Sequence, residues 1–130
     1  MLILVPTIQF QDSSYIINEE DRMLTAILVR SGDLSKRSAI RCYTRQETAS
    51  AGVDYYERSN TDDDVVIFEA NEKTQECVVA IIDDLFYEGT EQFGLVLGQS
   101  QLQHGFGQSL IGKRRRAEAK IIDINDRKLL

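Results

Sequence analysis

Hydrophobic and polar residues alternate along most of this 130-residue chain, in short runs rich in Val, Ile, Tyr and Phe. A period of two residues is typical of strands that bury one face. The predicted strands cover residues 7–10 together with 15–18, 23–30, 37–44, 64–69, 75–82, 92–98 and 116–122. Seven strands at this spacing predict an all-β fold, specifically a seven-stranded immunoglobulin-like antiparallel β-sandwich.

One segment breaks this rhythm. Residues Gly98 to Gly112 are rich in Gln and Gly, and they contain the only histidine of the chain, His104. We expect a long mobile loop here, either a tolerated insertion or a loop that binds a partner.

The bulk properties favour a single globular domain over residues 1–130, with its core at about 7–126. Because the chain starts and stops close to its outermost strands, we expect a domain excised from a larger multidomain protein. The net charge of −6 argues against a nucleic-acid partner. No apolar run approaches the roughly 18 residues of a membrane span, so direct membrane insertion of this domain is not expected.

The turn between two apolar runs holds the most informative acids of the chain. Asp83 and Asp84 end one predicted strand, Glu88 and Glu91 follow, and the apolar pattern resumes at Phe93. Four acids so close together repel one another unless a cation lies among them. Calcium favours six to eight oxygen ligands of this kind. The alternative interpretation is a solvated acidic turn.

Two further charged runs are open to more than one interpretation. Asp62-Asp63-Asp64 precedes a predicted strand and is interpreted as a solvated turn rather than a ligand set. Lys113-Arg114-Arg115-Arg116 could be a nuclear signal, a processing site or a contact for an anionic glycan. Charges at a strand edge that discourage aggregation are the favoured interpretation of this basic run.

Several short stretches follow one another in a characteristic order: Arg30-Ser31-Gly32-Asp33-Leu34, Tyr43-Thr44, Ala49-Ser50-Ala51-Gly52-Val53-Asp54-Tyr55, Phe68, Ile82-Asp83-Asp84, Glu88 and Glu91-Gln92-Phe93. Together they resemble the Calx-beta domain of sodium/calcium exchangers, of one integrin cytoplasmic tail and of extracellular matrix proteins of the Fraser-syndrome type. The resemblance runs from about Ile8 to Asn125 and is closest to the matrix branch.

The resemblance implies a sandwich that binds Ca²⁺ at one pole. The implied ligands are Glu19, Asp54, Asp83, Asp84, Glu88 and Glu91, followed by a terminal group at Asp123, Asn125 and Asp126. This terminal group departs from the family pattern of consecutive aspartates, because Ile124 and Asn125 replace two carboxylates. Fewer carboxylates predict fewer or weaker sites, in the range of roughly 10⁻⁴ to 10⁻³ M that extracellular modules use.

The resemblance also implies that Cys42 and Cys77 point into the sandwich from different strands. A disulfide between them fits an oxidising compartment, whereas two buried free thiols would act as small hydrophobic side chains. Both states remain open from the sequence.

We therefore expect a non-catalytic calcium-binding module of a matrix or cell-adhesion protein, in which calcium stiffens the junction to a neighbouring domain. An enzyme is not expected, since a single histidine provides no catalytic triad. The expected location is extracellular, in the matrix or basement membrane, within a secreted or membrane-anchored parent. Expected partners are calcium, neighbouring domains and other matrix or adhesion proteins. The alternatives are a calcium-independent structural or protein-interaction module and a cytosolic calcium sensor of a transporter.

Overall fold

The computed structural model describes residues 5–83 and 89–122 of the chain, and these ranges contain nine strands and two short 3-10 helices. The strands are β1 (Thr7–Phe10), β2 (Ser14–Asn18), β3 (Met23–Ser31), β4 (Ser38–Gln46), β5 (Val65–Phe68), β6 (Thr74–Ala80), β7 (Glu91–Gln99), β8 (Leu110–Ile111) and β9 (Arg116–Ile122). The 3-10 helices are η1 (Glu19–Asp21) and η2 (Asp62–Asp64).

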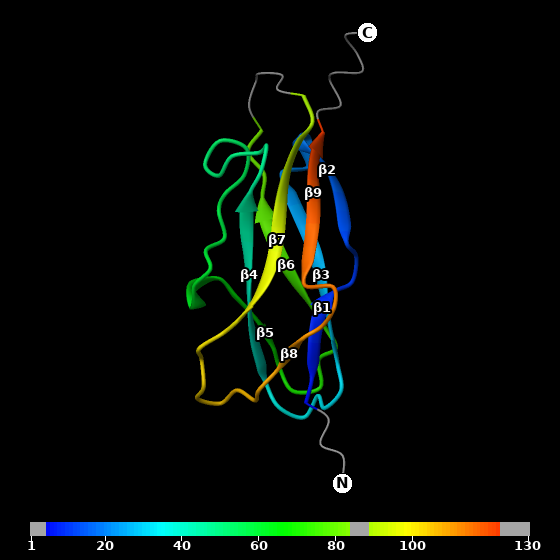
Figure 1. Cartoon of the computed structure of the whole chain (residues 1–130), viewed down its shortest axis with the longest axis vertical. Helices are drawn as coiled ribbons and strands as arrows, with labels where there is room; N and C mark the ends of the chain where they lie inside the picture. Colours follow the sequence, from blue (N-terminus) through cyan, green and yellow to red (C-terminus); the bar gives the residue numbers. More distant parts are fainter. Residues whose placement is uncertain (1–4, 84–88, 123–130) are drawn as a thin grey trace.

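The strands form two facing sheets, which confirms the predicted all-β sandwich (Figure 1). The smaller sheet has the order β6-β3-β1-β8 and the larger one the order β2-β9-β7-β4-β5. The core lies between them, because alternate residues of each strand point inward. In β9, for example, Ala117, Ala119 and Ile121 are buried while the residues between them are exposed.

The observed strands differ from the predicted seven in two places. The predicted strand over residues 7–10 and 15–18 is divided, because β1 pairs with β3 in one sheet and β2 pairs with β9 in the other. The short β8 was not predicted, and it lies beside β1. Both additional pairings, β1–β8 and β2–β9, are parallel, so the sandwich is not purely antiparallel. Alternation shows which residues are buried but not which sheet a strand joins.

A disulfide joins the two sheets through the core. Cys42 lies on β4 of the larger sheet and Cys77 on β6 of the smaller sheet, with their Cα atoms 6.4 Å apart. The disulfide interpretation of the two cysteines is therefore confirmed. Arg58 links the same two strands from the side, since its guanidinium donates to the carbonyl oxygens of Cys42 and Val78 at 2.6 and 3.2 Å.

A buried arginine stabilises the end of the sandwich where β3 and β5 finish and β4 and β6 begin. Arg30 is 3% exposed, and its guanidinium lies 5.2 Å from the centre of the Phe68 ring. Its guanidinium donates to the Ser38 hydroxyl and to backbone carbonyls of the β3–β4 and β5–β6 connections; the carbonyls belong to Leu34, Lys36, Glu69 and Glu72. Burial lowers the pKa of Arg30 from its ordinary value. The five hydrogen bonds that Arg30 donates compensate for the burial of its charge.

The predicted mobile loop is held in place at several points. The Ser100 hydroxyl donates to Asp62 Oδ1 at 2.9 Å, and the Gly107 amide donates to the Arg37 carbonyl at 2.8 Å. The Arg37 guanidinium also lies 4.6 Å from the centre of the Phe106 ring. Residues 100–109 therefore pack against both η2 and the β3–β4 connection, rather than extending freely into solvent.

Within the described ranges, no helix is both long and apolar enough to cross a membrane. The expectation of a membrane-anchored parent gains no support from these residues.

Replacement of Arg30 by Met should lower the free energy of unfolding by at least about 3 kcal/mol, because it leaves the buried Ser38 hydroxyl and four part-buried carbonyls without their donor. Arg37→Met provides the matched control, since Arg37 is 41% exposed in its ion pair with Glu69. The control should cost less than about 1 kcal/mol. Urea unfolding with the disulfide intact measures both values, and equal losses would contradict the structural role of Arg30.

Candidate metal centre

The predicted ligands that the structure describes gather at one end of the sandwich, here called the C-terminal pole. At this end β2, β4, β6 and β9 finish, while β3 and β7 begin (Figure 1). Glu19 follows β2 directly, Asp54 lies in the β4–β5 connection, Asp83 follows β6, and Glu91 opens β7. The structure thus places four acids from distant parts of the sequence at the same pole.

Asp54 occupies a tight turn formed by small residues. Its Oδ2 accepts the Ser50 amide at 2.8 Å, and the Asp54 amide donates to the Ser50 carbonyl at 2.9 Å. Gly52 completes the turn with a φ of 81°, a left-handed conformation that favours glycine. The small residues therefore allow the tight turn of the backbone that directs the carboxylate of Asp54 inward.

Tyr55 fixes this turn to the core. The ring is 1% exposed and stacks on Phe93 with the ring centres 4.2 Å apart. Burial raises the pKa of the Tyr55 phenol above its ordinary value. The neighbouring backbone pairs with the end of β6, since the Tyr56 amide donates to the Ala80 carbonyl and the Ile82 amide to the Asp54 carbonyl, both at 2.9 Å. These bonds hold Asp54 beside the segment that leads to Asp83.

The remaining acids are connected to the same pole through the sheets. Glu91 pairs with Ile121 on β9, and Asn18, which precedes Glu19, pairs with Ile122. The Ala49 amide also donates to the Gln92 carbonyl at 2.8 Å, so the turn of Asp54 contacts the start of β7. The positions of Glu19 and Glu91 follow from strand register.

A positively charged side chain that the sequence analysis did not identify, that of Arg22, lies at this pole. Arg22 places its Nη2 3.7 Å from Asp83 Oδ2, and the two side chains are 72% and 29% exposed. Arg22 ends η1 with a φ of 62°, and its carbonyl accepts the Ile81 amide at 2.8 Å. Its position directly after the three acids of η1 places a positive charge at this pole, but no sequence signal pairs it with Asp83. Arg22 offsets part of the negative charge of the pole.

The described acids alone do not form a complete metal centre. Within residues 5–83 and 89–122, no three His, Cys, Asp or Glu side chains are grouped closely enough to hold a metal ion. Five predicted ligands lie outside the described residues and stay predictions: Asp84, Glu88, Asp123, Asn125 and Asp126. The carboxylates of Asp54, Asp83 and Glu91 have the oxygen chemistry that calcium favours.

The second acidic run has a structural role. Asp62 Oδ1 accepts from Arg41 Nε at 3.0 Å as well as from Ser100, and the Arg41 hydrogen bond is the main cause of the lowered pKa of Asp62. Asp64 Oδ2 accepts the amide and the hydroxyl of Ser59 at 2.6 and 2.8 Å. The turn expected to be solvated is instead held by hydrogen bonds from neighbouring side chains and backbone to Asp62 and Asp64.

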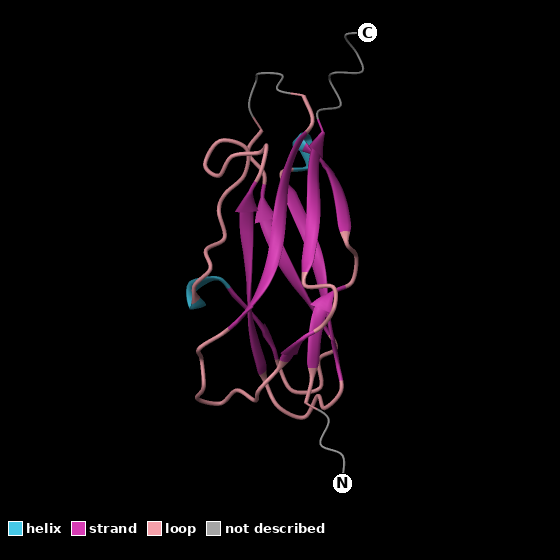
Figure 2. Ribbon diagram, viewed as in Figure 1, coloured by secondary structure: helices cyan, strands magenta, loops and turns pink. Residues whose placement is uncertain are grey.

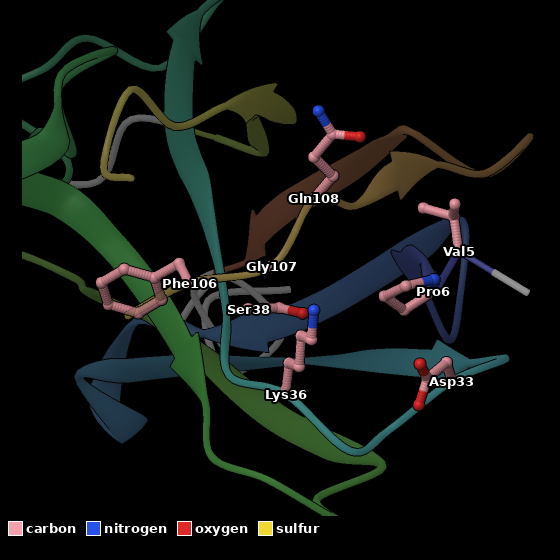
Figure 3. Close-up of a pocket in the computed structure, with 8 residues that line it drawn as sticks. All are labelled: Val5, Pro6, Asp33, Lys36, Ser38, Phe106, Gly107 and Gln108. Atoms are coloured by element: carbon pink, nitrogen blue, oxygen red, sulfur yellow. The ribbon is translucent and has the colours of Figure 1, made fainter. Parts of the chain in front are cut away.

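A pocket of about 360 Å³ lies at the opposite, N-terminal pole. Figure 3 shows Phe106, Gly107 and Gln108 of the long loop lining it together with Val5, Pro6, Asp33, Lys36 and Ser38. Its lining contains one acid, Asp33, and one base, Lys36. This composition does not suit a divalent cation, so the C-terminal pole remains the candidate site.

The fold and the acidic pole together define a β-sandwich module whose connections carry acids at one pole. A family model for the Calx-beta domain matches residues 4–125, and the chain belongs to this family. The resemblance found in the sequence is thereby confirmed.

The curated relatives are large extracellular matrix proteins. The chain is 38% identical over 122 residues to extracellular matrix protein 3 of Lytechinus variegatus. The alignment covers 94% of the chain and 4% of that protein. It is 34% identical over 126 residues to human FRAS1-related extracellular matrix protein 2, with 97% and 4% covered. The mouse extracellular matrix organizing protein FRAS1 is 37% identical, with 94% and 3% covered. The chain spans only this small fraction of each relative.

Solved structures agree on the fold. The apo form of the Calx CBD1 domain has a TM-score of 0.76 at 24% identity, covering 92% of this chain and 97% of that one. The calcium binding domain CBD12 of CALX1.1 has a TM-score of 0.72 at 25% identity, covering 89% and 45%. The Calx CBD2 domain has a TM-score of 0.79 at 18% identity, covering 95% and 90%.

The turn of Asp54 should depend on its carboxylate even without metal. In the presence of a chelator, Asp54→Ala should lower the free energy of unfolding by about 1–3 kcal/mol, because the part-buried Ser50 amide loses its acceptor. The exposed Asp63 provides the control, and Asp63→Ala should change stability by less than about 0.5 kcal/mol. Chemical denaturation measures both, and an Asp54→Ala protein as stable as the control would contradict this role.

Proposed function

We propose that this domain is a non-catalytic calcium-binding module of an extracellular matrix or cell-adhesion protein. Calcium would bind at the C-terminal pole and tie together the segments that carry Glu19, Asp54, Asp83 and Glu91. The proposed ligand set also includes Asp84, Glu88 and the terminal Asp123, Asn125 and Asp126.

The buried carboxylate of Asp54 is the observation that carries this proposal. Asp54 is 9% exposed, and within the described part of the chain it forms no ion pair. Its single side-chain hydrogen bond there, from the Ser50 amide, occupies one of the two carboxylate oxygens. A buried carboxylate normally has a charged partner or coordinates a metal. A calcium ion at the pole would supply that partner.

The position of the pole supports a role for calcium. β9, the last described strand, ends at Ile122 on the same pole as the candidate ligands (Figure 2). Calcium that joins the turns around the end of β9 would restrict the motion of a junction to a neighbouring domain. Neighbouring domains and other matrix proteins are therefore the proposed partners, and the pole gives no reason to propose catalysis.

The extracellular location is supported by two independent observations. The relatives bear the names of extracellular matrix proteins. The disulfide between Cys42 and Cys77 belongs to an oxidising compartment. A cytosolic calcium sensor of a transporter is correspondingly disfavoured. Millimolar calcium outside cells also suits a site with fewer carboxylates than those of the exchangers.

A calcium-independent structural module is the second candidate. The observation that favours it is Arg22, whose guanidinium already offsets the charge of Asp83. The replacement of terminal carboxylates by Ile124 and Asn125 points in the same direction. The two candidates differ in a measurable property, the response of stability to calcium.

Calcium at about tenfold above its Kd should raise the melting temperature by roughly 3–8 °C over the value in chelator, because the ion binds the folded state alone. Asp83→Asn should reduce this shift, whereas Asp63→Asn, which removes the same charge outside the pole, should retain it. Differential scanning calorimetry measures all three proteins. No shift at several millimolar calcium would exclude the calcium function and leave the structural module.

Arg22 should compete with calcium for Asp83. Arg22→Gln should strengthen calcium binding about two- to fivefold, since it removes one exposed positive charge close to the ligands. Arg37→Gln is the matched control, because Arg37 forms an exposed ion pair with Glu69 away from the pole. Isothermal titration calorimetry gives the Kd values. Unchanged or weaker binding by the Arg22 variant would show that Arg22 is no competitor.

A further inference from the structure

The connection between β8 and β9 carries four consecutive basic residues across the side of the sandwich. Its first part follows β1, since the Gly112 amide donates to the Ile8 carbonyl at 2.8 Å and the Phe10 amide to the Arg114 carbonyl at 2.9 Å. Its second part joins β7, where the Leu97 amide donates to the Arg115 carbonyl at 3.0 Å. The connection, coloured orange in Figure 1, is thus held by both sheets.

The four side chains form an exposed basic surface, here called the basic patch (Lys113–Arg116). Together with Gln9 and Ser13 they line a shallow depression of about 690 Å³. Arg114 is fixed by backbone carbonyls rather than by an acid, because its Nη1 donates to the oxygens of Gln11 and Phe10 at 2.6 and 3.4 Å. The guanidinium therefore keeps its positive charge uncompensated.

Two acids lie near the basic patch without neutralising it. Asp12 acts electrostatically on the Tyr15 phenol together with Arg114, and Glu118 follows Arg116 on the outer face of β9. Glu118 Oε2 accepts from the side-chain Nε2 of Gln92 at 2.8 Å. Among the described residues, no salt bridge joins an acid to any of the four basic side chains. The basic patch is a local excess of positive charge on a chain of net charge −6.

Protection of a strand edge is one role for these charges. Lys113 and Arg114 lie next to β1, in line with the edge strand β8, where charges discourage pairing with another chain. Arg116 pairs with Val96 of β7, whereas β2 begins only opposite Glu118. Edge protection gives no role to the depression that the four side chains form with Gln9 and Ser13.

We propose that the basic patch binds a linear sulfated polysaccharide. Its sulfate groups would meet the four cations, while Gln9 and Ser13 would hydrogen-bond to sugar hydroxyls. None of the six residues that line the depression is a Trp, Phe or Leu of the kind that anchors an interfacial segment in a lipid surface. The choice of polysaccharide rests on the proposed extracellular location, but it does not depend on calcium binding.

The experiment measures binding of heparin to the whole chain in chelator at about 0.15 M NaCl, the physiological ionic strength. Lys113→Gln with Arg115→Gln removes two charges of the basic patch and spares Arg114, which has structural hydrogen bonds. Lys36→Gln with Lys73→Gln removes two exposed charges elsewhere and serves as the control. Circular dichroism confirms that both variants are folded.

The patch variant should bind heparin about three- to tenfold more weakly than the unaltered chain. The dependence of its Kd on salt should also become shallower, because fewer counterions are released on binding. The control should bind within about twofold of the unaltered chain. Desulfated heparin should bind much more weakly than heparin to all three proteins.

Four results would overturn the proposal: no heparin binding at low salt, equal losses in both variants, equal binding of desulfated heparin, or tighter binding to anionic phospholipid vesicles or to polyglutamate. Because the measurement is made in chelator, its failure leaves the calcium function intact. Conversely, a missing calcium effect on melting would leave the heparin result unchanged. The two proposals therefore fail separately.

Discussion

The burial of Tyr55 is the interaction on which the acidic pole depends. Its ring is 1% exposed and stacked on Phe93, so the β4–β5 connection is drawn into the space between the sheets. The backbone on both sides of Tyr55 then pairs with the end of β6 through Asp54 and Tyr56. Burial of one aromatic side chain, worth about 1.5–3 kcal/mol, thus places Asp54 next to the segment of Asp83.

The other stabilising contacts of the sandwich lie away from the candidate metal site. The disulfide between Cys42 and Cys77 joins the sheets through the core, and Arg58 bonds to carbonyls of the same two strands. Arg30 donates hydrogen bonds to the turns of the N-terminal pole. Among the acids of the C-terminal pole, Asp54 stabilises its own turn through the Ser50 amide. The proposed calcium ion would add to the stability that these contacts provide.

Strand alternation and the family motifs together predicted most of the fold and the pole at which the described acids lie. The positions of Asp54, Asp83 and Glu91 at one pole follow from strands that end there, which the sequence pattern already indicated. Three features could not be predicted. The division of the first strand depends on which sheet each half joins, β8 is only two residues long, and the Arg22–Asp83 ion pair depends on a left-handed backbone at Arg22. Each depends on contacts between distant segments, which local periodicity does not encode.

A crystal structure of the chain at several millimolar calcium is the most direct test of the central claim. The account predicts an ion at the C-terminal pole, with carboxylate oxygens of Asp54, Asp83 and Glu91 about 2.3–2.6 Å from it, the usual calcium–oxygen distance. An ordered pole that holds no ion under these conditions, with Arg22 still paired to Asp83, would contradict it.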